Sequence, residues 1–122
     1  MALTILVIDD STSLRQVVAM TLKGAGYDVL QAGDGKEALV FLDGRKIAMA
    51  VCDVNMPNMN GIEFVIEAKK IAAYKFMPIL MLTTESQESK KAEGKAAGAK
   101  AWMLKPFSPS SLLSAVSKFC VP

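Results

Sequence analysis

Apolar and polar residues alternate in blocks along this chain, and five of the apolar blocks are short. They span residues 4–8, 27–31, 47–52, 78–82 and 101–104. Runs of this length, each followed by polar or turn-forming residues, predict strands. The block at 47–52 is apolar throughout, which predicts a central strand buried on both faces. The block at 27–31 is weaker and is expected at an edge of the sheet.

Between these blocks, apolar residues recur at the spacing of a helix. The first helix is predicted to follow residues 9–13, with an apolar stripe formed by Leu14, Val17, Val18, Leu22 and Ala25. A short helix is predicted to open at Asp34 and Gly35. A third begins at Gly61, with Ile62, Val65 and Ile66 on one face. The last two are expected over residues 88–98 and from Ser110 or Ser111 onward.

Strands that alternate with helices through short connections predict a parallel sheet with helices on both faces. The predicted fold class is therefore α/β, a doubly wound five-stranded parallel sheet with five helices. The chain has 122 residues, of which 52% are hydrophobic and 21% charged. This length and this balance predict a single domain over residues 1–122.

Composition and charge narrow the functional classes. The net charge is only +2, so the chain lacks the strong basic footprint of a nucleic-acid-binding domain. No apolar stretch reaches the roughly 18 residues of a membrane span, and no signal peptide is apparent. Histidine is absent, which excludes histidine-based catalysis. A disulfide between Cys52 and Cys120 is not expected, and a cytoplasmic location is favoured.

Polar side chains stand where four of the predicted strands end. Asp9 and Asp10 follow the first strand, Asp53 the third, Thr83 the fourth and Lys105 the fifth. In a parallel sheet the carboxyl ends of the strands share one edge, where ligands bind. Three carboxylates, one hydroxyl and one ammonium are therefore expected to converge there.

Such a set of side chains has a definite chemistry. Three neighbouring carboxylates repel one another unless a cation intervenes, and oxygen-only ligands suit Mg²⁺ before Ca²⁺. The main-chain carbonyl of Asn55 could add a further oxygen. A carboxylate is then the only well-placed nucleophile, and Asp53 is the single acid on the central strand. Lys105 would neutralise a transferred phosphoryl group, and the Thr83 hydroxyl could hydrogen-bond to it.

These positions resemble those of the response-regulator receiver family over essentially the whole chain. The match comprises Asp9-Asp10, Asp53 within Asp-Val-Asn-Met-Pro-Asn-Met-Asn-Gly, Thr83 and Lys105-Pro106. The resemblance is close to stand-alone, chemotaxis-type (CheY-like) receivers. It is this resemblance, and not the pattern of apolar blocks, that implies the strand order 2-1-3-4-5 of a flavodoxin-like fold.

The resemblance also implies roles at the predicted site. Asp53 would accept phosphate from the phosphohistidine of a sensor kinase. Asp10, Asp53 and the main-chain carbonyl of Asn55 would hold Mg²⁺, with Asp9 acting through water. Asn55 and Glu85 would tune the lifetime of the phosphoryl group.

A second group of implied roles concerns the response to phosphorylation. Thr83 and Trp102 would form the switch, in which the aromatic side chain rotates inward. The Lys105-Pro106 peptide bond would be cis and would aim the ammonium at the site. Receivers of this kind usually carry Tyr or Phe where this chain has Trp102, so a switch and a purely packing role for the indole both stay open.

The leading functional hypothesis is a phosphorylation-operated switch, not an enzyme, that acts by binding another protein. The resemblance places its target on the fourth helix, fifth strand and fifth helix, and a flagellar motor switch protein is the favoured target. A phosphate sink or phosphorelay intermediate is the near variant, and the need for a phosphatase is left open.

Functions of other classes fit the residues less well. A Mg²⁺-dependent aspartyl phosphohydrolase would want an acid where Asn55 stands. A flavin carrier would need a phosphate cradle where Asp9 and Asp10 would repel the phosphate. Lys90, Lys91, Lys95 and Lys100 are interpreted as a solvated helix face, with a docking surface for an acidic partner as the alternative.

Overall fold

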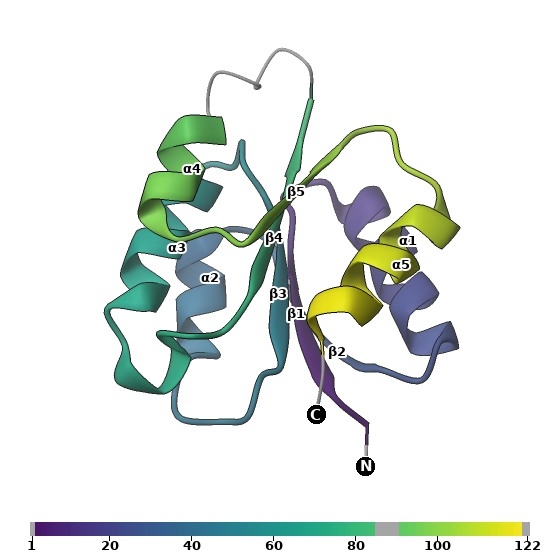
Figure 1. Ribbon diagram of the computed structural model, residues 1–122, viewed down its shortest axis with the longest axis horizontal. Helices are drawn as coiled ribbons and strands as arrows, with labels where there is room; N and C mark the ends of the chain where they lie inside the picture. The colour runs from purple at the N-terminus through teal and green to yellow at the C-terminus, as the bar shows by residue number, and fades with distance from the viewer. Residues whose placement is uncertain (1, 85–90, 121–122) are drawn as a thin grey trace.

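Five parallel strands form one sheet in the order β2-β1-β3-β4-β5 (Figure 1). The computed structural model describes residues 2–84 and 91–120. The strands are β1 (Thr4–Ile8), β2 (Asp28–Ala32), β3 (Met49–Asp53), β4 (Ile79–Thr83) and β5 (Ala101–Leu104). The predicted fold class and the strand order that the resemblance implied are both confirmed.

Helices cover both faces of the sheet (Figure 1). One face carries α1 (Thr12–Gly24) and α5 (Pro109–Phe119), and the other carries α2 (Gly35–Val40), α3 (Gly61–Lys69) and α4 (Lys91–Ala97). A short 3₁₀ helix, η1 (Ala72–Tyr74), lies between α3 and β4. No helix among the described residues is long and apolar enough to cross a bilayer.

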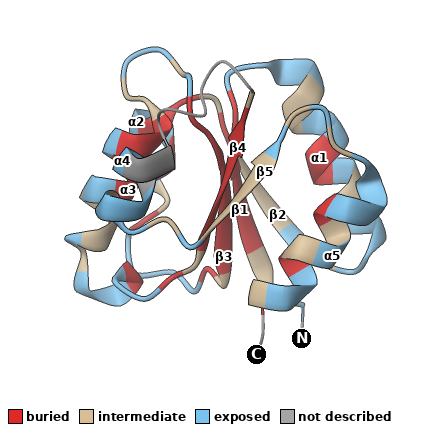
Figure 2. Cartoon of the chain, turned by 45° about the horizontal axis from the view of Figure 1, so that its top comes forward, coloured by how far each residue is buried: buried red, intermediate tan, exposed pale blue. Residues whose placement is uncertain are grey.

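The sheet separates two hydrophobic core clusters, because successive side chains of a strand point to opposite faces. Ile5 and Val7 of β1 belong to the cluster under α1 and α5, whereas Leu6 and Ile8 belong to the cluster under α2 and α3. All residues of β3 and β4 are buried, while β2 at the edge is mostly intermediate (Figure 2). The predictions of a buried central strand and a weak edge strand are confirmed.

Several element boundaries differ from the prediction. β3 runs to Asp53, which pairs with Leu82 of β4, so the acid is the last residue of the strand. The last helix begins at Pro109 and not at Ser110 or Ser111. Its N-cap is Ser108, whose side chain accepts a hydrogen bond from the Ser111 amide. Proline suits the first position of a helix because it has no amide hydrogen to satisfy there.

Two predicted helix faces were also wrong in part. Val17 of α1 is 54% exposed and Ile66 of α3 is 42% exposed, whereas Ala19 and Phe64 are buried in their place. Helical spacing allows either face, and the rotation of each helix against the sheet decides between them. The predicted start of the fourth helix, at residue 88, lies outside the described residues. Both cysteines are free, as predicted, and Cys120 is buried as well as Cys52.

Candidate functional site

Three carboxylates meet at the carboxyl edge of the sheet. Oxygens of Asp9, Asp10 and Asp53 all lie within 4.8 Å of one another. The register explains this, because Ile8 of β1 pairs with Cys52 of β3 and the next residue on each strand is an acid. The convergence that the strand ends predicted is therefore confirmed for the acids.

The Lys105 ammonium lies between two of these carboxylates. Its Nζ donates a hydrogen bond to Oδ1 of Asp53 at 3.0 Å and lies 3.6 Å from Oδ2 of Asp9. The Lys105 amide donates to the carbonyl of Thr83, and the Lys105–Pro106 peptide bond is cis. Thr83 is buried at the end of β4. All the strand-end residues singled out in the sequence are thus at this edge.

Burial differs sharply between the two neighbouring acids. Asp9 is 1% exposed, whereas Asp10 is exposed. Oδ1 of Asp9 accepts a hydrogen bond from the Ser11 amide at 2.9 Å, but Oδ2 is buried with no hydrogen-bond partner among the described residues. A buried carboxylate oxygen without a hydrogen bond is costly, even with the Lys105 ammonium 3.6 Å away. This oxygen therefore fits a site that a cation completes.

The pKa of Asp53 also indicates a site for a cation. Burial raises the pKa of the Asp53 carboxyl, the hydrogen bond from Lys105 lowers it, and Asp9 raises it again; the net pKa is above the ordinary value. Among the described cations, only Lys105 forms an ion pair with these acids. One ammonium cannot balance three carboxylates. The oxygen donors and the uncompensated charge fit a hard divalent ion such as Mg²⁺.

The loop after β3 carries Asn55 and is fastened to neighbouring elements. Nδ2 of Asn58 donates to Oδ2 of Asp34 at 2.7 Å, and the Gly35 amide donates to the Met59 carbonyl at 3.3 Å. Asn58 has a φ of 64°, a left-handed conformation that asparagine tolerates better than most residues. These contacts tie the loop to the start of α2.

The Asp34–Asn58 tether was not foreseen from the sequence. The sequence predicts Asp34 only as the opening of a helix, and its Oδ1 does accept a hydrogen bond from the Glu37 amide as an N-cap. Its pKa is lowered, first by that amide and then by Asn58. The available signal was an asparagine in a turn-rich loop, which suggests a left-handed residue but does not name its partner.

At its other end, the loop runs directly into α3. Asn60 and Glu63 form a reciprocal capping box, in which each side chain accepts a hydrogen bond from the other residue's amide. The Gly61 amide donates to the Val54 carbonyl at 2.8 Å, so the helix starts against the end of β3. The segment that carries Asn55 is therefore anchored on both sides.

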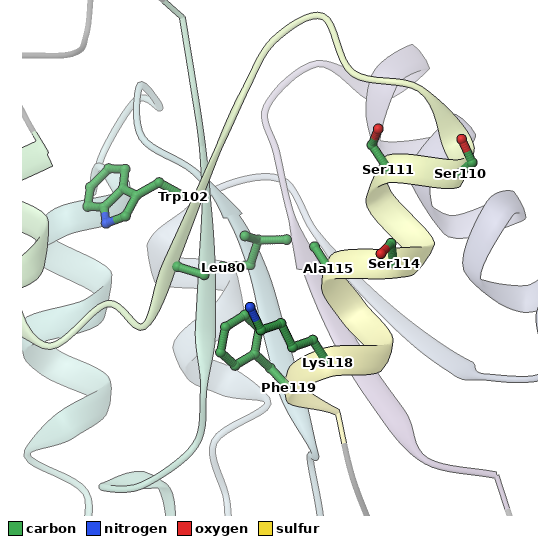
Figure 3. Close-up of a pocket in the computed structure, with 9 residues that line it drawn as sticks. Leu80, Trp102, Ser110, Ser111, Ser114, Ala115, Lys118 and Phe119 are labelled. Carbon is green, nitrogen blue, oxygen red and sulfur yellow. The ribbon is translucent and has the colours of Figure 1, made fainter.

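Trp102 lies on β5, the strand next to α4. Its side chain packs against the core cluster under α2 and α3, and its Nε1 is buried with no hydrogen-bond partner among the described residues. Figure 3 shows the indole extending away from α5, on the other side of the strand. Trp102 also borders a pocket of about 580 Å³ with Ser110, Ser114 and Phe119 of α5. Glu85 lies outside the described residues.

Comparison with known sequences gives a family match. The response regulator receiver domain matches residues 5–117. The chain is 37% identical over 110 residues to chemotaxis protein CheY1 of Helicobacter pylori, covering 88% of this chain and 89% of that protein. It is 42% identical over 106 residues to the alkaline phosphatase synthesis transcriptional regulatory protein PhoP of Bacillus subtilis, but it spans only 43% of that protein.

Solved structures give the same result. Chemotaxis protein CheY4 of Vibrio cholerae is 47% identical and superposes with a TM-score of 0.92, over 98% of this chain and 99% of that chain. A response regulator from Chloroflexus aurantiacus has the same TM-score at 32% identity, over 98% of each chain. The likeness thus extends over nearly the whole chain.

Proposed function

The chain belongs to the response regulator receiver family, and we propose that it works as a magnesium-dependent phosphoacceptor in chemotaxis signalling. As a receiver it is a phosphorylation switch, a signalling protein and not a conventional enzyme, and the family implies a histidine kinase as its phosphodonor. An acidic triad such as Asp9, Asp10 and Asp53 is typical of the Mg²⁺ site of receivers. The observation that carries the proposal is the Lys105 ammonium 3.0 Å from buried Asp53.

Asp53 is the nucleophile in the proposed reaction. One of its carboxylate oxygens attacks the phosphorus of the kinase phosphohistidine, the phosphorus–nitrogen bond breaks, and the imidazole leaves with the electron pair. The product is an acyl phosphate on Asp53. The Lys105 ammonium, already 3.0 Å from Oδ1, neutralises charge on the phosphoryl oxygens, and the Thr83 hydroxyl hydrogen-bonds to one of them.

Mg²⁺ is the proposed cofactor of this step. Asp10, Asp53 and the main-chain carbonyl of Asn55 would hold the ion, and Asp9 would act through water. When bound, the ion offsets the charge of the carboxylates and of the phosphoryl group. Oδ2 of Asp9, which is buried without a hydrogen bond among the described residues, supports this assignment. Asn55 and Glu85 would set how long the phosphoryl group persists.

A phosphodonor experiment tests this proposal. We expect Mg²⁺ and acetyl phosphate to add one phosphoryl group per chain, measured by intact-protein mass. Borohydride reduction of the acyl phosphate, followed by peptide mapping, should locate it at Asp53. EDTA should prevent the labelling. A label on another residue would contradict the assignment of Asp53, and labelling that persists in EDTA would contradict the need for Mg²⁺.

The proposed output is binding of a target protein at the face formed by α4, β5 and α5. Two relatives named as chemotaxis proteins, CheY4 and CheY1, align with this chain over 99% and 89% of their own lengths, which supports a chemotaxis role. The pocket between β5 and α5 gives this face a hollow for a partner (Figure 3). A flagellar motor switch protein is the proposed target.

Trp102 is expected to report the switch by fluorescence. It is the only tryptophan in the sequence, so the indole emission has one source. Addition of beryllofluoride with Mg²⁺ should change the emission intensity, because a rotation would move the buried Nε1 into a different environment. Asp53→Asn should remove the beryllofluoride response. An unchanged spectrum in the parent protein would assign Trp102 a packing role only.

A further inference from the structure

A second hollow lies at the opposite end of the sheet from the acidic site. This basic pocket, about 360 Å³ in volume, is lined among others by Lys69, Lys75, Phe76, Gly98 and Lys100. Lys100 directly precedes β5, so the pocket lies near the amino ends of the strands. Figure 1 shows the η1 segment, which leads into it, at the far end from the loops that follow β1 and β3. Nothing in the proposed phosphoryl transfer uses this surface.

Lysines dominate the charge of the basic pocket. Lys69, Lys75 and Lys100 all line it, and none of them forms an ion pair with a carboxylate among the described residues. The Lys69 Nζ donates to the Met77 carbonyl. A Cβ added to Gly98 would stand 3.3 Å from the Lys69 Cγ, so the lysine stem lies over that glycine. One ammonium is thus held in place inside the pocket.

The fixed Lys69 ammonium is electrostatically uncompensated. Burial lowers its pKa, and the charge of Lys100 lowers it further. Like charges that line one concave surface raise the local concentration of anions. An anionic group placed among these lysines would relieve the repulsion between them. The arrangement of the three lysines and their positive charge both indicate that the pocket binds a negatively charged group.

Phe76 gives the basic pocket an apolar surface beside its lysines. Its side chain is 88% exposed, more than any other large hydrophobic residue in the described part of the chain. The Lys75 Nζ lies 5.7 Å from the ring centroid. Small ligands bind where walls bury most of their surface, whereas the Phe76 ring lines this pocket with most of its surface still open to solvent. A peptide segment that crosses the pocket can cover the ring with one apolar side chain.

We propose that the basic pocket docks an acidic peptide segment of a partner protein. Carboxylates of the segment contact Lys75 and Lys100, and an aliphatic or aromatic side chain packs on Phe76. Because the pocket and the acidic site lie at opposite ends of the sheet, the segment leaves Asp53 accessible. The protein can therefore hold this partner in both phosphorylation states. This docking is independent of the proposed phosphoryl transfer.

A titration of the ¹⁵N-labelled full chain tests the docking site. The probe is a synthetic blocked peptide of sequence Asp-Glu-Leu-Phe-Asp-Glu-Leu-Glu, monitored through backbone amide shifts. We expect saturable shifts confined to residues 69–78 and 97–100. Lys75→Glu combined with Lys100→Glu should weaken the binding at least about tenfold, since it replaces two attractions with two repulsions. Phe76→Ser, at an exposed position, should also weaken it.

A matched double variant separates local contacts from overall charge. Lys23→Glu with Lys36→Glu makes the same charge change at two exposed lysines of α1 and α2. The affinity of this variant for the peptide should stay within about twofold of the parent's. The amide spectra of all variants verify that they fold. Equal weakening in this control would overturn the proposal. So would the absence of shifts at about 1 mM peptide, equal binding of a peptide with serine in place of leucine and phenylalanine, or tighter binding of a short RNA.

Discussion

The Asp53→Asn variant is expected to take up no phosphoryl group from acetyl phosphate. The amide of asparagine is not a nucleophile toward phosphorus. Neither of the other two acids that the structure describes at the site can replace Asp53, because Asp9 is buried and already hydrogen-bonded and Asp10 is exposed. Intact-protein mass after incubation with Mg²⁺ and acetyl phosphate measures the result. Asp28→Asn removes an exposed acid on edge strand β2 and should be labelled like the parent.

The same variant is expected to raise the free energy of unfolding, whereas most substitutions lower it. The pKa of Asp53 is raised in the folded protein, so the fold binds this proton more tightly than the unfolded chain does. At pH values below the unfolded pKa, the carboxyl is protonated in both states and costs nothing. As the pH rises through the folded pKa, ionisation of the buried group destabilises the fold. The amide that Asp53→Asn introduces cannot ionise, so the variant should be the more stable protein at neutral pH in EDTA.

Urea unfolding at several pH values measures this difference. The advantage of Asp53→Asn should be present at pH 7 in EDTA and should shrink as the pH falls below the ordinary range of aspartate. Mg²⁺ should stabilise the parent more than the variant, since an ion that binds only the folded state adds to stability by mass action. A variant less stable than the parent in EDTA at pH 7 would show that the ion pair with Lys105 outweighs the cost of burial.

The positions of the acids were predictable from the sequence because they depend on topology alone. Each acid stands where an apolar run stops, and a parallel sheet brings such ends together. How deeply each acid is buried was not predictable. Asp9 and Asp10 are neighbours in the chain, yet one is buried and the other exposed, because successive residues after a strand point in opposite directions.

Features that depend on contacts far apart in the sequence escaped prediction. The Asp34–Asn58 hydrogen bond joins residues 24 positions apart, and Asn58 makes it from a backbone with positive φ. The exposed side of α1 at Val17 follows from how the helix rests on the sheet, which periodicity does not determine. The start of α5 was different, because Pro109 marks a first helical position in the sequence itself.

Gly61→Ala is expected to lower the free energy of unfolding by about 2–3 kcal/mol. A Cβ at this position would stand 2.2 Å from the main-chain oxygen of Asp53 and 3.0 Å from the Cα of Val54. Both are backbone atoms of the central strand and its continuation, so neither can move aside as the end of a side chain can. The Met81 Cε, at 2.8 Å, is the only one of the three nearest atoms that can move cheaply.

The clash links the stability of the fold to the acidic site. To admit the methyl group, the start of α3 must move away from the end of β3, and the loop that carries Asn55 must move with it. We therefore expect weaker Mg²⁺ binding and slower phosphorylation in Gly61→Ala, in addition to a lower midpoint of urea unfolding. Gly24→Ala is the matched control, since a Cβ at Gly24 meets nothing within 4 Å. At this helical position alanine should add about 0.5 kcal/mol of stability.

A Gly61→Ala protein as stable as the parent would contradict this prediction. It would show that the loop after β3 absorbs the methyl group, and that the acidic site does not depend on the close contact between α3 and β3.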